Sequence, residues 1–368
     1  MTKAYMIIDL QFGSTGKGLL AGYLAKRLKP DVVATAWSPN AGHTYIDENG
    51  RKFVHCMLAN SIVSPSLTTV LIGAGSTLDL DLLYKEIESC ADLLRHKTII
   101  IHPHAAVVTQ AHRDIEKRNV KIGSTMKGSG ASAIQRMERD PDNNPTVVAQ
   151  IDIDWLNKVH ELGIHIVVDA KRYDLAISTA KLIAIEGAQG YSLSMYHGFY
   201  PYTTSRDVTP HQTLADTCMP YGIDCKIFGT MRTFPIRVAN RYNEEGEMIG
   251  TSGRVYDDQQ EISWEGIGLE PELTTVTKLP RRIFTFSMEQ AREAYFRCQP
   301  DVLFLNFVNY QSIEENMELI DQLRDIGYDV ALVGTGATHN DVKPTHGYAI
   351  GTLANKFRDL WRTRGDKK

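Results

Sequence analysis

The sequence predicts an α/β fold with a mainly parallel central sheet and flanking helices. Two observations lead to this prediction. Short apolar runs bounded by turn residues recur along the 368-residue chain, and longer segments with helical spacing of apolar residues separate them. Several of the short runs are continuously apolar, which is typical of strands buried on both faces. Strands that alternate with helices are usually joined by right-handed crossovers, so the sheet is expected to be parallel.

The predicted strands, in chain order, are Tyr5–Leu10, Val32–Ala36, Val70–Ile72, Thr98–Ile101, Ile164–Val168, Leu182–Ile185, Val302–Phe307 and Val330–Val333. The clearest predicted helices are Leu19–Leu28, Leu80–Leu94 and Ser312–Ile326. We treat residues 1–368 as one large α/β domain, because no linker or repeat interrupts the pattern. Polar, turn-rich stretches near residues 138–150 and 240–270 are the expected excursions from the core, and Arg362–Lys368 is expected to fray.

The composition argues against several classes of protein. The chain is 43% hydrophobic and 23% charged, with a net charge of −4 and a pI near 6.3, so it has no basic footprint for nucleic acid or for an anionic membrane. No apolar run reaches the roughly 20 residues that a membrane-spanning helix needs. The five cysteines include no CxxC pair, and we expect reduced thiols, mostly in the core, in a cytoplasmic protein.

A glycine-rich segment, QFGSTGKG (Gln11–Gly18), lies between the first predicted strand and the first predicted helix. Backbone N–H groups in such a turn approach phosphate closely, and a helix N-terminus favours negative charge. Lys17 would add a point charge for the phosphates. The usual phosphate-loop signature has four residues between its first glycine and the Gly-Lys pair, whereas Gly13 and Gly16 are separated by two. A turn that merely requires glycine is the alternative interpretation of this segment alone.

The second polar segment, PNAGHTY (Pro39–Tyr45), follows the predicted strand Val32–Ala36. It carries Asn40, His43 and Thr44 in a turn of small residues. Ligands of α/β sheets bind at the carboxyl ends of strands, so His43 is a candidate general acid.

Later motifs complete a series that is known from one family. They are IGSTMKGSG (Ile122–Gly130), EGAQG (Glu186–Gly190), HGFYPYTTS (His197–Ser205), PRR (Pro280–Arg282) and VGTG (Val333–Gly336). In this order and spacing, from residue 11 to about 336, the chain resembles adenylosuccinate synthetase. The resemblance implies an adenylosuccinate-synthetase-like fold with a variant phosphate loop. Members of the family phosphorylate the 6-oxygen of a purine nucleotide from a nucleoside triphosphate, and the amine of aspartate then displaces that phosphate.

The resemblance also implies roles for residues at matching positions. Ser14, Lys17 and His43 are expected in catalysis, with His43 stabilising charge on the phosphorylated oxygen. Mg²⁺ is the expected cofactor, at Ser14 and the carbonyl of Gly42. The residues expected at the triphosphate are Ser14, Thr15, Gly16, Lys17, Gly18, Gly42, His43, Thr44 and Gly336. Those expected at the acceptor nucleotide are Ser14, Asn40, Thr125, Arg139, Gln189 and Thr204, with Arg139 reaching across a homodimer interface. Those expected at L-aspartate are Thr274, Thr275, Thr277 and Arg281.

Three departures from the family pattern point to one branch of it. Where the family loop has an aspartate that removes the purine N1 proton, this chain has Ser14, which leaves room for a 2-amino group. The stretch LNFVNY (Leu305–Tyr310) lacks the carboxylate that recognises the guanine of GTP, so an adenine triphosphate is expected. The aspartate loop reads TTVTKLPRR, with Leu279 where the family has an arginine near the ribose 2′-hydroxyl.

These departures resemble the phage-type branch, the 2-aminoadenylosuccinate synthetases, which join aspartate to dGMP with ATP or dATP. The expected location is therefore the cytoplasm, that of a host cell if the chain is phage-encoded. The loss of the general base leaves the N1 proton without an obvious acceptor. Asp9 is the nearest carboxylate in sequence, although its place at the end of a strand fits a structural role equally well.

Two alternatives remain open from the sequence. The first is an ordinary adenylosuccinate synthetase that uses IMP and GTP, against which Ser14 and LNFVNY argue. The second is a catalytically silent nucleotide-binding module that regulates a partner, for which the loss of the aspartate at Ser14 is the best support. A preference test among triphosphates separates the first alternative, and nucleotide binding without hydrolysis would indicate the second.

Overall fold

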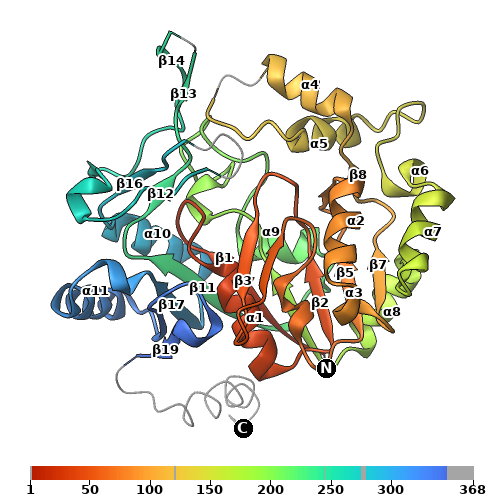
Figure 1. Ribbon diagram of the computed structural model, residues 1–368, viewed down its shortest axis with the longest axis horizontal. Coiled ribbons are helices and arrows are strands. Elements are labelled where there is room, and N and C mark those ends of the chain that lie inside the picture. The colour runs from red at the N-terminus through yellow and green to blue at the C-terminus, as the bar shows by residue number, and fades with distance from the viewer. Residues whose placement is uncertain (1, 120–121, 244, 275–278, 346–368) are drawn as a thin grey trace.

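The computed structural model describes residues 2–119, 122–243, 245–274 and 279–345 (Figure 1). Its centre is a ten-stranded sheet in the order β19-β18-β17-β11-β1-β10-β2-β5-β7-β9. Every neighbouring pair is parallel except β18 and β19 at one edge, so the predicted mainly parallel α/β fold is confirmed. The strands of this sheet are β1 Lys3–Asp9, β2 Val32–Thr35, β5 Thr69–Ile72, β7 Thr98–Ile101, β9 His165–Val168, β10 Leu182–Glu186, β11 Asp224–Arg232, β17 Val302–Asn306, β18 Val330–Gly334 and β19 Val342–Pro344.

Helices cover both faces of the sheet, as Figure 1 shows. They are α1 Lys17–Leu28, α2 Leu80–Ser89, α3 Ala91–Leu94, α4 Gln110–Asn119, α5 Ser129–Glu138, α6 Val147–Gln150, α7 Ile153–Glu161, α8 Ala170–Thr179, α9 Pro210–Asp216, α10 Met288–Cys298 and α11 Ile313–Ile326. Alternate residues of a strand point to opposite faces. Tyr5 and Ile7 of β1 therefore join the core beneath α1, α2 and α7, while Met6 and Ile8 join the core beneath α8, α10 and α11.

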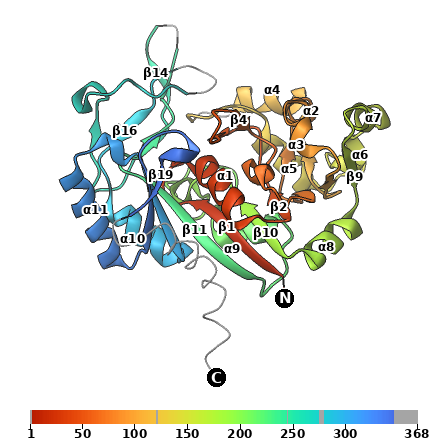
Figure 2. The same ribbon diagram turned by 60° about the horizontal axis from the view of Figure 1, so that its bottom comes forward.

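Strand β1 lies in the interior of the sheet, between β10 and β11 (Figure 2). Both partners come from much later in the chain: Lys3 is paired with Leu182 on one side and with Asp224 on the other. All of β1 after Lys3 is buried, which explains the continuous apolar run in the sequence.

Smaller sheets lie outside the central one. They comprise β3 His43–Ile46 with β4 Lys52–His55, β6 Thr77–Leu78 with β8 Ala106–Val107, β13 Arg241–Tyr242 with β14 Met248–Gly250, and β12 Ile236–Arg237 with β16 Arg282–Phe284 and β15 Glu261–Ile262. The predicted excursion at 240–270 contains the hairpin β13–β14, which projects from the body of the molecule in Figure 1. The other excursion, 138–150, contains the end of α5, a turn and α6.

The sequence missed two strands of the main sheet and merged two helices. The eight predicted strands are all present, but β11 and β19 were not predicted. The predicted helix Leu80–Leu94 is divided at Cys90, which has φ −116° and separates α2 from α3. All five cysteines are free thiols, and two of them, Cys90 and Cys298, are buried. No helix within the described residues has both the length and the apolar character needed to cross a membrane.

Candidate functional site

The polar motifs follow the carboxyl ends of neighbouring strands in the central sheet. The segment Gln11–Gly18 follows β1, Gly187–Gly190 follows β10, Pro39–Thr44 follows β2, and Gly334–Gly336 ends β18. Because parallel strands end at the same edge of a sheet, these loops gather there. The motifs that are scattered in sequence therefore form one candidate site.

The buried carboxylate of Asp9 organises the phosphate loop. Its Oδ1 accepts hydrogen bonds from the backbone N–H groups of Gln11, at 2.9 Å, and Gly13, at 3.2 Å. Its Oδ2 accepts from the backbone N–H of Thr15, at 3.3 Å, and from its hydroxyl, at 2.5 Å. The ammonium of Lys17 lies 3.2 Å from the same oxygen. With all these donors and 1% exposure, Asp9 is a structural residue that fixes the loop.

Lys17 connects the phosphate loop to the motif after β10. Its Nζ donates to the backbone carbonyl of Gln189 at 2.7 Å, besides its contact with Asp9. The side-chain amide of Gln189 in turn donates to Oδ1 of Asn40 at 3.1 Å. One polar chain thus joins Lys17, expected at the triphosphate, to Gln189 and Asn40, expected at the acceptor nucleotide.

Two glycines permit the close packing of these loops. A Cβ at Gly190 would lie 2.4 Å from the carbonyl oxygen of Gln11 and 2.5 Å from the backbone nitrogen of Gly13. A Cβ at Gly18 would lie 2.6 Å from the carbonyl oxygen of Thr44. Larger residues at these positions would push the phosphate loop away from its two neighbours. Gly190 and Gly18 therefore allow the loops to pack against one another.

Several predicted site residues have left-handed backbone conformations. Ser14 and Gln189 both have φ 59°, and Arg139 has φ 55°. Such conformations are uncommon for residues other than glycine and cluster at functional sites. Ser14 is exposed, so its hydroxyl is accessible from solvent, whereas the hydroxyl of Thr15 points inward to Asp9 and to Thr230.

His43 begins β3 and is 6% exposed. Burial, with smaller contributions from Lys17 and His55, holds the pKa of His43 well below its usual range. The imidazole is therefore neutral at pH 7, and it is stacked on the indole of Trp37 with 3.9 Å between ring centroids. A neutral imidazole can donate one hydrogen bond to a developing negative charge. Its neighbours Gly42 and Thr44 are exposed.

Arg232 links the phosphate loop to the expected aspartate loop. Its guanidinium, with 0% exposure, donates to the carbonyl of Ser14 at 3.1 Å and to both carboxylate oxygens of Glu272 at 2.5 and 3.3 Å. The carbonyl of Glu272 accepts from the backbone N–H of Arg281 at 2.8 Å. The hydroxyl of Thr274 accepts from the N–H of Leu279 at 3.1 Å. Thr275 and Thr277, also expected at aspartate, lie outside the described residues.

The carboxylate of Glu116 holds the second glycine-rich loop in place. Glu116 of α4 accepts from the backbone N–H groups of Gly128 and Gly130 at 2.7 Å each, at the start of α5. Thr125 precedes these contacts and is partly exposed. Glu116 therefore shapes the loop.

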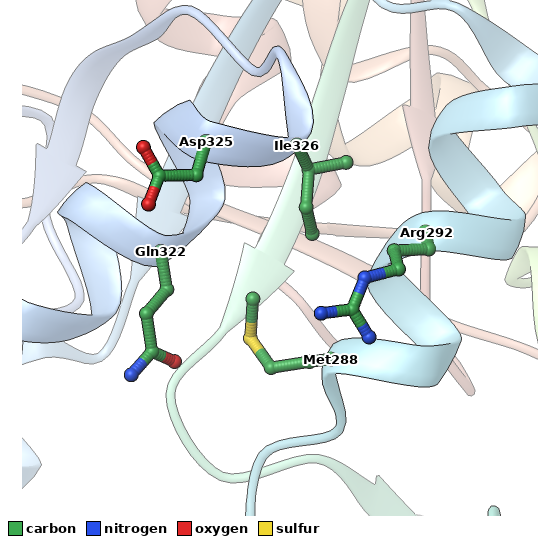
Figure 3. A pocket seen from close by; sticks show the side chains of 5 residues that line it. All are labelled: Met288, Arg292, Gln322, Asp325 and Ile326. Carbon is green, nitrogen blue, oxygen red and sulfur yellow. The ribbon is translucent and has the colours of Figure 1, made fainter.

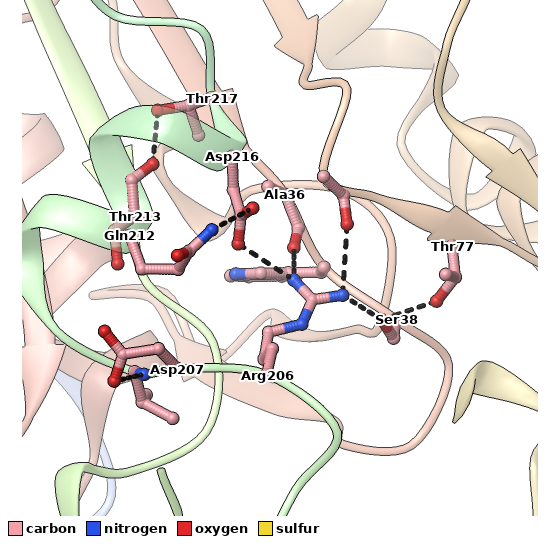
Figure 4. Close-up of polar contacts among 12 residues, drawn as sticks. Ala36, Ser38, Thr77, Arg206, Asp207, Gln212, Thr213, Asp216 and Thr217 are labelled. Carbon is pink, nitrogen blue, oxygen red and sulfur yellow. Dashed lines mark hydrogen bonds and ion pairs between the residues drawn. The ribbon is translucent and has the colours of Figure 1, made fainter. Parts of the chain in front are cut away.

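Arg206 fixes the loop that carries Thr204 (Figure 4). Its guanidinium donates to the carbonyl of Ala36, to the hydroxyl of Ser38 and to the carbonyl of Gly75, and it lies 3.5 Å from the carboxylate of Asp216. The backbone N–H of Thr204 donates to the carbonyl of Leu193 at 2.8 Å.

Two predicted residues lie at the periphery of this arrangement. Arg139 caps the end of α5, and its Nε donates only locally, to the carbonyl of Met137 at 3.3 Å. Gly336 lies in the turn after β18, where a Cβ would be 2.6 Å from a carboxylate oxygen of Asp341.

Sequence reasoning missed four residues that build the site: Trp37, Arg206, Arg232 and Asn306. The amide of Asn306, at the end of β17, donates to the carbonyl of Thr15 at 3.2 Å. For Asp9 the sequence leaves a structural and a catalytic role open, although its place directly before the glycine-rich turn is a usable signal. The other four act through partners distant in sequence, which no local pattern reveals.

The described residues contain no cluster of three or more His, Cys, Asp or Glu side chains suited to holding a metal ion. A magnesium ion held mainly by substrate phosphates needs only one or two protein oxygens. The exposed hydroxyl of Ser14 and the carbonyl of Gly42 are oxygen donors of that kind.

A separate groove lies between α10 and α11 (Figure 3). Its lining residues are Met288, Arg292, Gln322, Asp325 and Ile326. These helices pack on the face of the sheet opposite α1, and the groove includes none of the predicted site residues.

Comparisons with known proteins agree with the motifs. The family model "Adenylosuccinate synthetase" matches residues 6–143 and 145–320. The N6-succino-2-amino-2′-deoxyadenylate synthase of Salmonella phage PMBT28 is 51% identical over 355 residues, covering 92% of this chain and 97% of the relative. The structure of cyanophage S-2L succinoaminodeoxyadenylate synthetase, bound to dGMP and to dATP as an energy donor, superposes with a TM-score of 0.84 at 39% identity and covers 99% of both chains. Adenylosuccinate synthetase from Plasmodium falciparum shares the fold, with a TM-score of 0.70, at 15% identity over 94% of this chain and all of that one.

Proposed function

The chain belongs to the adenylosuccinate synthetase family, and from that premise we propose that it joins L-aspartate to C6 of dGMP with hydrolysis of ATP or dATP. The product would be 2-amino-2′-deoxyadenylosuccinate, a precursor of 2-aminoadenine nucleotides for DNA. The observation that carries the substrate assignment is Ser14: it is exposed and neutral, its carbonyl accepts a hydrogen bond from the side chain of Arg232, and it lies at the place where the resemblance expects a carboxylate. The phage relatives and their dGMP- and dATP-bound member support the same choice.

The proposed reaction has two steps. In the first, the 6-oxygen of dGMP attacks the γ-phosphorus of the triphosphate, the bond from that phosphorus to the β-phosphate oxygen breaks, and the diphosphate leaves. In the second, the amine of aspartate attacks C6 and inorganic phosphate leaves. The two steps need two nucleotides held with the reacting atoms in line, which proximity can accelerate strongly.

The triphosphate is assigned to the phosphate loop, whose backbone Asp9 holds rigid. Gly16–Gly18 present the N-terminus of α1, which favours negative charge. Lys17 would exchange its contact with the carbonyl of Gln189 for a phosphate oxygen, while Asp9 keeps its ammonium beside the loop. Gly42, Thr44 and Gly336 are assigned to the same ligand from neighbouring loops.

The acceptor nucleotide is assigned to the other side of Lys17. Gln189 and Asn40, already joined by a hydrogen bond, would contact the base, while Thr125 and Thr204 would donate to the 5′-phosphate. His43, neutral at pH 7, would donate a hydrogen bond to the 6-oxygen as charge develops there. Arg281 and Thr274 are assigned to aspartate, with Thr275 and Thr277, because a planar guanidinium pairs well with a carboxylate.

Mg²⁺ is the proposed cofactor. The hydroxyl of Ser14 and the carbonyl of Gly42 would hold it together with substrate phosphates. When bound, the ion would neutralise charge on the transferred phosphoryl group. The group that removes the N1 proton of guanine is not assigned: Asp9 is buried and all its contacts are made within the loop.

A homodimer is part of the proposal. Arg139 lies on the surface at the end of α5, and the same helix exposes the apolar side chains of Ile134 and Met137, which are 61% and 66% exposed. Exposed apolar side chains beside a charged residue are typical of an interface. A second copy seated there would bring Arg139 to the 5′-phosphate of its partner's nucleotide. We expect the enzyme to act in the cytoplasm of a host cell, since the matched relatives are phage proteins.

The decisive experiment supplies the purified protein with Mg²⁺, aspartate and ATP or dATP, and offers dGMP or IMP in parallel. A succinyl adduct of dGMP, formed in step with ADP or dADP, is the expected result. An adduct formed much faster from IMP, with GTP as donor, would indicate an ordinary adenylosuccinate synthetase. Nucleotide binding without hydrolysis of any triphosphate would indicate the regulatory module.

A further inference from the structure

Trp37 is a buried residue that contacts His43 of the candidate site. It lies two residues after the end of β2 and is 2% exposed, and its indole lies face to face with the imidazole of His43. The ring centroids are 3.9 Å apart and the planes differ by 15°. Stacked rings at this distance restrict each other's rotation, so the plane of His43 is set by the plane of Trp37.

The indole itself is fixed by a hydrogen bond. Its Nε1 donates to the backbone carbonyl of Glu186 at 2.9 Å, at the end of β10. Strand β10 pairs with β2 in the interior of the central sheet, so the acceptor of this bond is rigid. A phenyl ring could fill the same space but could not make this bond.

The backbone around Trp37 is held on both sides. Arg206 donates to the carbonyl of Ala36 at 2.6 Å and to the hydroxyl of Ser38 at 2.8 Å, as Figure 4 shows. Thr77 donates through its N–H to the carbonyl of Trp37 at 3.1 Å and through its hydroxyl to Ser38 at 2.5 Å. Residues 36–38 therefore form a platform on which the indole has one orientation.

From this arrangement we propose that Trp37 is a positioning residue for His43: it holds the imidazole plane so that one ring N–H points at the 6-oxygen of the acceptor nucleotide. The inference rests on the proposed function, in which His43 acts on that oxygen. Pre-organised donors accelerate reactions because they need no reorientation as charge develops. The ring of Trp37 lies behind His43 and is buried, so it contributes through His43 and not by direct contact with substrate.

The test is a double-mutant cycle in the full-length protein, with Trp37→Leu and Trp37→Phe in the wild-type and His43→Asn backgrounds. With His43 present, Trp37→Leu is expected to lower kcat about tenfold and to leave each KM within about twofold, while Trp37→Phe, which keeps an aromatic face, recovers most of the rate. In the His43→Asn background, Trp37→Leu is expected to change kcat by less than about twofold, because the residue through which it acts is gone.

A second readout does not require turnover. Proton NMR of His43 in the wild type should show ring-current shifts from the indole, which Trp37→Leu removes and Trp37→Phe reduces.

Equal losses of kcat from Trp37→Leu in both backgrounds would overturn the proposal, as would unchanged NMR signals of His43. If the protein turns over neither dGMP nor IMP, the proposed function is wrong, but this result does not bear on the contact between Trp37 and His43. The ring-current shifts still decide whether Trp37 fixes His43.

Discussion

The carboxylate of Asp9 and the ammonium of Lys17 lie 3.2 Å apart beneath the phosphate loop, with side-chain exposures of 0% and 7%. The two charges come from the last residue of β1 and the first residue of α1. The ion pair therefore joins the two ends of the loop, and the backbone N–H groups of the loop also donate hydrogen bonds to Asp9. The loop is pre-shaped before any nucleotide binds.

Replacing Asp9 with asparagine should destabilise the fold and weaken triphosphate binding. The substitution keeps the shape of the side chain but leaves the buried ammonium of Lys17 without its counter-charge, which typically costs about 3 kcal/mol. Denaturant unfolding and the KM for ATP measure the two effects. Asp142→Asn removes an exposed carboxylate in the 138–150 excursion and serves as the control, with an expected change below about 0.5 kcal/mol. Equal unfolding midpoints for both variants would contradict the structural role of Asp9.

Replacing Ser14 with aspartate should move the preference from dGMP towards IMP. The longer, charged side chain would occupy space beside the purine C2 and would supply a base for N1, an effect worth about 10²- to 10⁴-fold where such a base acts. The ratio of kcat/KM for the two acceptors is the measurement. Ser14→Ala removes the hydroxyl without adding a base, so it should not raise the activity on IMP. If Ser14→Asp lowers the rates with both acceptors equally, the specificity role of Ser14 is wrong.

Mixing two inactive variants tests the shared site. Arg139→Ala and His43→Ala are each expected to be inactive alone. At equal concentrations of the two variants, half of all dimers contain one subunit of each kind. If Arg139 acts across the interface, each such mixed dimer has one intact site of its two. Activity should then return to about a quarter of wild type. Mixed dimers that regain no activity would confine Arg139 to its own subunit.

The contribution of Glu186 to the stability of the protein should fall as the pH rises from about 4.5 to 7. Burial raises the pKa of Glu186 from 4.5 to about 7. In this window the unfolded chain releases the proton while the folded chain retains it, so the contribution to stability is full below pH 4.5 and is lost by pH 7. The loss is on the order of 3 kcal/mol.

Unfolding at a series of pH values should therefore show that stability falls less, or rises more, with pH for Glu186→Gln than for wild type. Glu86, whose pKa burial also raises to about 7, acts in the same direction as Glu186, whereas His55, whose pKa burial lowers to about 4, acts in the opposite direction. The exposed Glu161→Gln variant should keep the wild-type slope. A Glu186→Gln profile that coincides with wild type would show that this carboxyl group does not titrate in the window.

Several of the predicted strands have a property that β11 lacks. Their continuous apolar runs indicate burial on both faces, whereas β11 reads DCKIFGTMR and contains Lys226 and Arg232. Both charged side chains are buried in the fold, with 4% and 0% exposure, because Asp301 lies 3.5 Å from the first and Glu272 2.5 Å from the second. These partners lie at least 40 residues further along the chain, so the local pattern could not identify the strand.

In the candidate site, too, the features that depend on neighbouring residues could be predicted, and those that depend on distant partners could not. The glycine-rich loop and the turn with His43 could be predicted because their chemistry is local: a strand, small residues and a polar group. The residues that orient them, Trp37 and Arg206, resemble ordinary core or surface residues in the sequence. Their roles depend on β10 and α9, which follow the turn by more than a hundred residues.

Because β1 lies in the interior of the sheet, it can pair with its neighbours only after much of the chain has been synthesised. The ribosome releases β1 first, yet its two neighbours end only at Glu186 and Arg232. Until both have emerged, the strand that precedes the phosphate loop has no permanent partner, and such distant pairings form slowly. The nascent N-terminus must therefore remain unaggregated through more than half of translation, and a product truncated before Arg232 could not assemble its nucleotide site. The interior position of β1 therefore ties completion of the sheet around the phosphate loop to the synthesis of β11.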